Sequence, residues 1–162
     1  VYIFGHSFGG RIAIKIAVST ERVAGIILCG AAGISRKSLF ERIFFFILAK
    51  IGKLIFPFSD FRSLAYKLAR EHDYERAKGI MREVFKRVVA EDLKPLLSHI
   101  KIPTLIIWGG LDKMTPVRDA YFIHQKIKNS SLTIFENEGH TFLYNKQEEV
   151  AEVITKWKKQ QT

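Results

Sequence analysis

Residues 1–10, which read VYIFGHSFGG, decide the fold of this chain. The four apolar residues at 1–4 are typical of a short buried strand, and the mostly apolar segment 8–19 predicts a helix. Residues 5–9 join the two as GHSFG, a G-x-S-x-G sequence. On a tight turn from strand to helix, this sequence is the pattern of a nucleophile elbow. We therefore predict that Ser7 is a nucleophile.

The backbone of such an elbow is strained, and side chains two residues before and after the serine would collide. Gly5 and Gly9 remove that collision, because glycine tolerates such backbone angles cheaply, and Gly10 extends the elbow into the helix. Ser7 is then held at a helix N-terminus, where N–H groups and the helix dipole favour negative charge. An attacking oxygen and a developing oxyanion need that environment.

The composition indicates a globular protein, and it gives no sign of a disulfide, a metal ion or another cofactor. The 162 residues are 48% hydrophobic, enough for one domain with a core. The one cysteine, Cys29, excludes an internal disulfide and favours a reducing, cytoplasmic location. The cysteine and the five histidines show no metal-site spacing, so we expect neither a metal ion nor another cofactor. The chain starts inside a strand and without methionine, so we expect upstream residues, including any targeting signal.

The formal net charge of +10 falls mainly on residues 34–100. Basic clusters can attract nucleic acid or anionic lipid. Here acidic residues are interleaved with the basic ones, which is typical of solvated helix faces, so we expect no nucleic-acid partner. Lys50 and Lys53 flank the apolar face of an aromatic-rich helical stretch at 39–58, so peripheral contact with a membrane surface is an alternative role for this stretch.

Short apolar runs alternate with helical patterns at both ends of the chain, which predicts parallel strands joined by crossovers. The middle of the chain reads as helices only. We therefore expect an α/β fold in which 1–33 and 101–162 form one core of about four parallel strands, with 34–100 inserted as a helical cap. The predicted elements are strands at 1–4, 23–28, 104–108 and 132–135, and helices at 8–19, 116–127 and 142–159.

A nucleophilic serine needs a base, and the base needs an orienting carboxylate. Asp112 lies four residues past the third predicted strand, and His140 lies five residues past the fourth. Because the carboxyl ends of parallel strands meet at one edge of a sheet, we expect Ser7, Asp112 and His140 to converge there. Glu136 and Glu138 are rival acids, but they are poorly placed to reach around the His140 ring.

The chain resembles the carboxyl-terminal part of an α/β-hydrolase of the lid-bearing esterase, lipase and C–C hydrolase type. The matching segments are GHSFGG at 5–10, IPTLIIWGGLD at 102–112 and EGH at 138–140. Residues 34–100 stand where such enzymes insert a cap. Together these features cover the whole chain.

The resemblance implies a role for each residue of the site. Ser7 is the nucleophile, His140 is the general base and then the general acid, and Asp112 is the orienting acid. The backbone N–H of Phe8 is one oxyanion donor. His6 points away from the nucleophile in such elbows and is read as structural.

In the family, four strands precede the elbow, and a loop after the third supplies a second oxyanion N–H. Nothing in this sequence corresponds to that loop, and losing one oxyanion donor typically costs about 100- to 1,000-fold in rate. The first strand would also present an unpaired apolar edge. We therefore expect a fragment that is a weak catalyst, unless a second copy in a homodimer covers the missing surface.

The resulting hypothesis is a serine hydrolase that cleaves a small apolar carboxylic ester or thioester through an acyl-enzyme. Two alternatives stay open. One is a C–C bond hydrolase with the same triad, and the other is a non-catalytic ligand-binding protein on the same fold.

Overall fold

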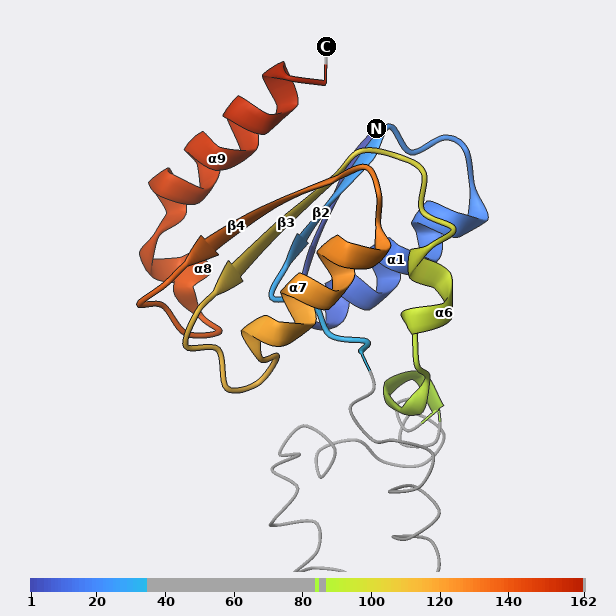
Figure 1. Cartoon of the computed structure of the whole chain (residues 1–162), viewed down its shortest axis with the longest axis horizontal. Coiled ribbons are helices and arrows are strands. Elements are labelled where there is room, and N and C mark those ends of the chain that lie inside the picture. The colour runs from blue at the N-terminus through green and yellow to red at the C-terminus, as the bar shows by residue number, and fades with distance from the viewer. Residues whose placement is uncertain (35–83, 85–86, 162) are drawn as a thin grey trace, which may run out of the picture. The chain divides into compact units, whose positions relative to one another are not determined.

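The computed structural model describes residues 1–34, 84 and 87–161 of the chain. The chain divides into two compact units, one made of Val1–Ile34 with Asp92–Thr162 and the other of Ser35–Glu91. Apart from residues 84 and 87–91, the coloured ribbon in Figure 1 is the first unit. The stretch proposed for membrane contact, 39–58, and most of the expected cap lie outside the described residues.

A sheet of four parallel strands forms the centre of the first unit, in the order β1-β2-β3-β4. In its middle, Ile27 pairs with Phe4 on one side and with Leu105 on the other, and Leu105 in turn pairs with Ser131. The carboxyl ends of all four strands therefore lie at one edge, and the predicted α/β architecture is confirmed. The strands are β1 (Tyr2–His6), β2 (Gly25–Cys29), β3 (Thr104–Gly109) and β4 (Ser130–Phe135).

Helices cover both faces of this sheet, because alternate residues of its central strands point to opposite sides. In β2, Ile26 and Leu28 belong to one buried cluster, whereas Ile27 and Cys29 belong to the other. Figure 1 shows the two helical layers. The first consists of α1 (Phe8–Ser19), α6 (Lys94–Leu97) and α7 (Val117–Lys126), and the second of α8 (Phe142–Asn145) and α9 (Gln147–Lys159).

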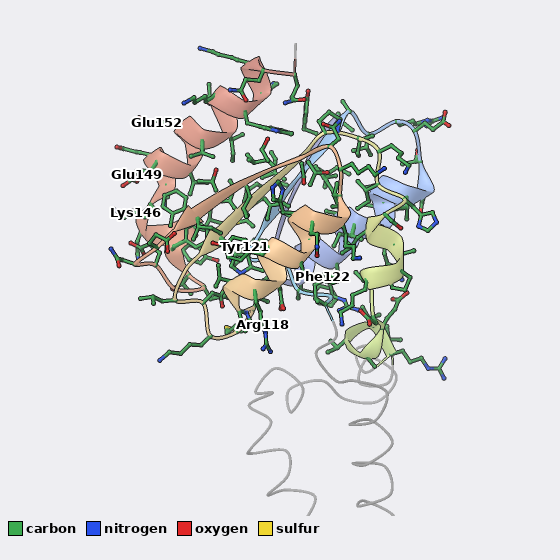
Figure 2. The ribbon with its side chains drawn as sticks, in the orientation of Figure 1. Arg118, Tyr121, Phe122, Lys146, Glu149 and Glu152 are labelled. Carbon is green, nitrogen blue, oxygen red and sulfur yellow. The ribbon has the colours of Figure 1, made fainter. Side chains whose placement is uncertain are left out.

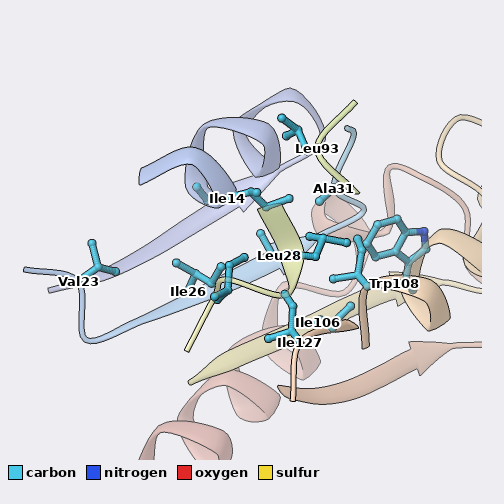
Figure 3. Packing of buried hydrophobic residues seen from close by; sticks show 14 residues of the cluster. Ile14, Val23, Ile26, Leu28, Ala31, Leu93, Ile106, Trp108 and Ile127 are labelled. Carbon is cyan, nitrogen blue, oxygen red and sulfur yellow. The ribbon is translucent and has the colours of Figure 1, made fainter. Parts of the chain in front are cut away.

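The larger cluster packs the first helical layer against the sheet (Figure 3). Ile14 of α1, Leu28 of β2 and Trp108 of β3 are all fully buried in it. Burying a side chain of this size contributes about 1.5–3 kcal/mol to stability. The cluster therefore holds α1 and the carboxyl ends of β2 and β3 at fixed positions relative to one another.

Residues 92–100 belong with the sheet, although we grouped them with the helical insert 34–100. Leu93, Leu97 and Ile100 are buried in the larger cluster. Leu93 and Leu97 are four residues apart, so one helical turn presents both to the core. The backbone N–H of Leu93 also donates to the Gly33 carbonyl at 2.9 Å, so the two stretches of chain that form the first unit are hydrogen-bonded to each other at this point.

The last predicted helix, 142–159, is two helices in the structure. Lys146 separates α8 from α9 because its backbone, at φ −123° and ψ 39°, leaves the helical region. Its Nζ pairs with Glu149 Oε1 at 2.9 Å, at the beginning of α9 (Figure 2). Among the helices that the structure describes, none has the length and apolar character needed to cross a bilayer.

Strand β1 lies at one end of the strand order and presents an apolar edge, as predicted. Phe4 is 43% exposed, and Tyr2 is 37% exposed. The Tyr2 ring packs edge-on against Trp157 of α9, with the ring centroids 5.8 Å apart. The second helical layer thus covers part of this edge.

The place of α6 in the core can be tested with Leu97→Ala. We expect this variant to lose about 2–5 kcal/mol of unfolding free energy, because it leaves a cavity in a fully packed cluster. Leu96→Ala, at a partly buried position of the same helix, is the matched control and should lose clearly less. Urea denaturation followed by circular dichroism measures both, and equal small losses would contradict the assignment of α6 to the core.

Candidate active site

Ser7 occupies a strained turn between β1 and α1. Its backbone, at φ 51° and ψ −115°, has a positive φ that is costly for a residue with a side chain. Three backbone hydrogen bonds hold it there. Its N–H donates to Cys29 O at 3.0 Å, and its carbonyl accepts from the N–H groups of Gly10 at 3.0 Å and Ala32 at 2.9 Å. The hydroxyl caps no helix N–H, so it is not occupied by that role.

The close approach at the elbow involves Gly5 and Gly10. A Cβ on Gly5 would lie 2.5 Å from the Gly9 carbonyl oxygen, which is the predicted collision. A Cβ on Gly10 would overlap the Cβ of Ala31, where α1 passes the end of β2. The expectation for Gly9 does not hold, since a Cβ there would have no heavy atom within 4 Å apart from its chain neighbours and the backbone of its own helix.

Asp112 follows β3 and is buried, yet its carboxylate receives a full set of donors. Oδ1 accepts the backbone N–H groups of Met114 and Thr115, each at 2.8 Å. Oδ2 accepts the Thr115 hydroxyl at 2.8 Å and His140 Nδ1 at 2.7 Å. Burial by itself would raise the pKa of Asp112, but the hydrogen bonds from His140 and Thr115 outweigh it and hold that pKa below its ordinary value.

His140 lies after β4, and its ring is oriented by Asp112. A carboxylate only accepts hydrogen bonds, so the 2.7 Å contact places a proton on Nδ1. In the neutral ring, Nε2 is then the nitrogen with a free lone pair. Glu136 and Glu138, the rival acids, do not form this contact. The structure thus brings the predicted acid and the predicted base together.

Backbone contacts at two glycines hold the Asp112 loop against the His140 loop. A Cβ on Gly109 would lie 2.5 Å from the Glu138 carbonyl oxygen, and a Cβ on Gly110 would overlap the Glu136 carbonyl oxygen. The Leu111 N–H donates to Glu138 O at 2.9 Å. A side chain at either glycine would therefore push the two loops apart.

Ser7 lies at the same edge of the sheet as this pair. Gly30 follows Cys29, the hydrogen-bond partner of the Ser7 N–H, and a Cβ on Gly30 would lie 3.4 Å from both Asp112 Oδ2 and His140 Nδ1. In the part of the chain that the structure describes, no hydrogen bond joins the Ser7 hydroxyl to the His140 ring. Such contacts often tighten only when substrate is bound.

Sequence reasoning missed two side chains that contact His140. His6 Nε2 donates to the His140 carbonyl at 3.2 Å, and the two rings lie 5.0 Å apart, so the elbow contacts the His140 loop directly. Thr115 contacts both members of the acid–base pair. The second could have been found from Asp112-Lys113-Met114-Thr115, because an aspartate often accepts backbone N–H groups two or three residues later.

Cys29 lies below the site and does not act as a nucleophile. It is fully buried in the smaller cluster, and burial, aided by the Asp112 charge, raises its pKa to about 12. The thiol is therefore uncharged at neutral pH. Within residues 1–34, 84 and 87–161, no group of three or more His, Cys, Asp or Glu side chains is arranged to hold a metal ion.

Comparison with known proteins gives a family match over most of the chain. Residues 1–147 match the family described as serine aminopeptidase, S33. The AB hydrolase superfamily protein YisY of Bacillus subtilis is 37% identical over 67 residues, which are 41% of this chain and 25% of that protein. The monoacylglycerol lipase ABHD6 of Rattus norvegicus is 31% identical over 77 residues, 45% of this chain and 23% of that protein. A pimeloyl-[acyl-carrier protein] methyl ester esterase of Neisseria meningitidis is 32% identical over 60 residues, 37% of this chain and 23% of that protein.

Solved structures show the same fold. An α/β hydrolase enzyme from the metagenome of Mar Chica lagoon sediments is 23% identical, with a TM-score of 0.65 over 99% of this chain and 61% of that chain. A lipase-esterase related protein from Clostridium acetobutylicum is 25% identical, with a TM-score of 0.64 over 96% of this chain and 65% of that chain. This chain thus spans less than two thirds of either structure.

The glycine contacts at the elbow generate a paired prediction. Gly10→Ala should lower the unfolding free energy by about 1–3 kcal/mol, because the added methyl overlaps Ala31. Gly9→Ala, its neighbour in the same helix, should be neutral or stabilise by up to about 1 kcal/mol, because alanine favours helix and the space is open. Thermal and urea unfolding measure both, and similar effects at the two positions would refute the packing.

The lowered pKa of Asp112 predicts a pH-dependent contribution to stability. Folding favours the ionised form of Asp112, because its pKa is lower in the native state than in the unfolded chain. The stabilisation is therefore present above the unfolded-state pKa and is lost as the pH falls through the native-state pKa. Asp112→Asn should therefore cost about 1–3 kcal/mol near pH 6 and progressively less towards about pH 3. Urea unfolding across this range tests it, and a difference independent of pH would contradict it.

Proposed function

Because this chain belongs to the serine aminopeptidase S33 family of α/β-hydrolases, we propose that it is a serine hydrolase that cleaves carboxylic ester or thioester bonds. One observation carries the proposal. The buried Asp112 carboxylate accepts His140 Nδ1 at 2.7 Å, at the edge of the sheet where Ser7 sits on its strained turn. An imidazole oriented in this way is the base that a serine nucleophile needs.

The chemistry follows from the proton on Nδ1. Nε2 of His140 takes the proton of the Ser7 hydroxyl while Oγ attacks the substrate carbonyl, and Asp112 stabilises the imidazolium that forms. The proton then passes to the departing alcohol or thiol, which leaves an acyl group on Ser7. Water, deprotonated by Nε2, releases the acid and restores the serine.

The oxyanion of each tetrahedral intermediate needs donors. We assign one of them to the backbone N–H of Phe8, the first residue of α1, beside Ser7. The positive end of the helix dipole adds to its effect.

The substrate class rests on the relatives and on the apolar residues around the site. Two of the relatives are, by name, a methyl ester esterase and a monoacylglycerol lipase. Near the acid loop, Leu111 and Met114 are 60% and 67% exposed, which suits an apolar acyl or alcohol group. We propose a small apolar ester or thioester as the substrate.

Active-site labelling with a fluorophosphonate tests the assignment in the protein encoded by the complete reading frame. Ser7→Ala should abolish labelling and lower turnover of 4-nitrophenyl butyrate by about 10⁴-fold or more. Ser19→Ala, at an exposed serine that ends α1, the helix following Ser7, is the matched control and should label like the parent protein. Labelling that survives Ser7→Ala would overturn the nucleophile. A parent protein that binds esters without label or turnover would favour a non-catalytic ligand-binding protein.

A further inference from the structure

The Thr115 hydroxyl lies between the two groups of the acid–base pair. Its Oγ1 is 2.8 Å from Asp112 Oδ2, 3.2 Å from His140 Nδ1 and 3.1 Å from the Gly30 carbonyl. Thr115 is itself 7% exposed. It therefore contacts the acid, the base and the end of β2 from a position largely shielded from water.

Counting protons shows what this hydroxyl can do. It has one proton and two acceptors within reach, and the shorter contact goes to the charged oxygen, Asp112 Oδ2. Hydrogen bonds to an ionised acceptor are the stronger kind. The hydroxyl lone pairs then face the Nδ1 proton of His140, which is shared between Oδ2 and Oγ1.

The backbone of Thr115 is fixed independently of this contact. Its carbonyl accepts the Trp108 Nε1 proton at 2.7 Å, and its N–H donates to Asp112 Oδ1 at 2.8 Å. Trp108 is fully buried in β3, so the larger core anchors this residue. A β-branched side chain also has few rotamers. The fixed backbone and the few rotamers therefore favour the position of the hydroxyl beside the pair.

We propose that Thr115 is a positioning residue of the proposed hydrolase, on whose function this inference rests. Its hydroxyl fixes the plane of the Asp112 carboxylate and so keeps Nδ1 of His140 as the protonated nitrogen. Without that donor, Oδ2 keeps only the His140 contact, while Oδ1 keeps its two backbone N–H donors, so the carboxylate is held less firmly about its Cβ–Cγ bond. The His140 ring then loses the orientation that presents Nε2 as the base.

Three variants separate positioning from folding. Thr115→Val removes the hydroxyl and keeps the branched shape, and Thr115→Ser keeps the hydroxyl. The matched control is Thr104→Val. Thr104 is buried like Thr115, but it lies at the opposite end of β3 and donates its hydroxyl to the Ile102 carbonyl at 3.1 Å. It loses the same atoms away from the site.

Kinetics on 4-nitrophenyl butyrate give the first measurement. Thr115→Val should lower kcat about tenfold with KM within about twofold, as expected for the loss of one hydrogen bond to a charged group. Thr115→Ser should recover most of the activity, and Thr104→Val should match the parent protein. Equal kcat values for the two valine variants would overturn the inference.

Proton NMR gives a measurement that needs no turnover. The hydrogen-bonded Nδ1 proton of His140 should give a downfield signal in the parent protein, in Thr115→Ser and in Thr104→Val. In Thr115→Val it should broaden or exchange with water at least about fivefold faster, because one partner is gone. An unchanged signal would overturn the inference. A parent protein without esterase activity but with this Thr115-dependent signal would refute the proposed function alone.

Discussion

The buried charge of Asp112 is the constraint on which the rest of the site depends. A carboxylate taken out of water is costly unless its lone pairs are filled. Here both oxygens are satisfied, two contacts coming from the turn that follows and two from the Thr115 and His140 side chains. The same contacts that make the charge tolerable also determine which nitrogen of His140 carries the proton. Stability and chemistry thus share one set of hydrogen bonds.

That set exists only because two loops start at the same level of the sheet. Strands β3 and β4 pair in parallel to their last residues, where Gly109 lies opposite Phe135. The loops then run against each other, and Gly109 and Gly110 allow their backbones to touch. On the other side, β1 and β2 end with His6 opposite Cys29, which brings the elbow to the same edge. The strand register, held by the buried core, therefore determines where the loops that carry the site residues begin.

The elbow shows the same relation between strain and support. A residue with a side chain at positive φ costs about 1–3 kcal/mol, and Ser7 keeps this conformation because its N–H and carbonyl are bound on both sides. The close contact of Gly10 with Ala31 brings α1 down onto the end of β2. His6, next to the serine, donates to the His140 carbonyl. The strained residue is therefore connected to the base loop through its neighbour.

The sequence by itself determined the alternation of strands and helices, the parallel sheet, the elbow at 5–9 and the pairing of Asp112 with His140, because each follows from local periodicity or from the edge where parallel strands end. Only the tertiary structure decided that 92–100 pack with the sheet, that Gly10 is confined and Gly9 is not, and that Thr115 and His6 contact His140. These depend on contacts between residues far apart in sequence, such as Thr115 with Gly30 at a separation of 85. A local pattern specifies which face of an element is apolar. It cannot specify which side chain from another element will meet that face, because this is settled only when the core is packed.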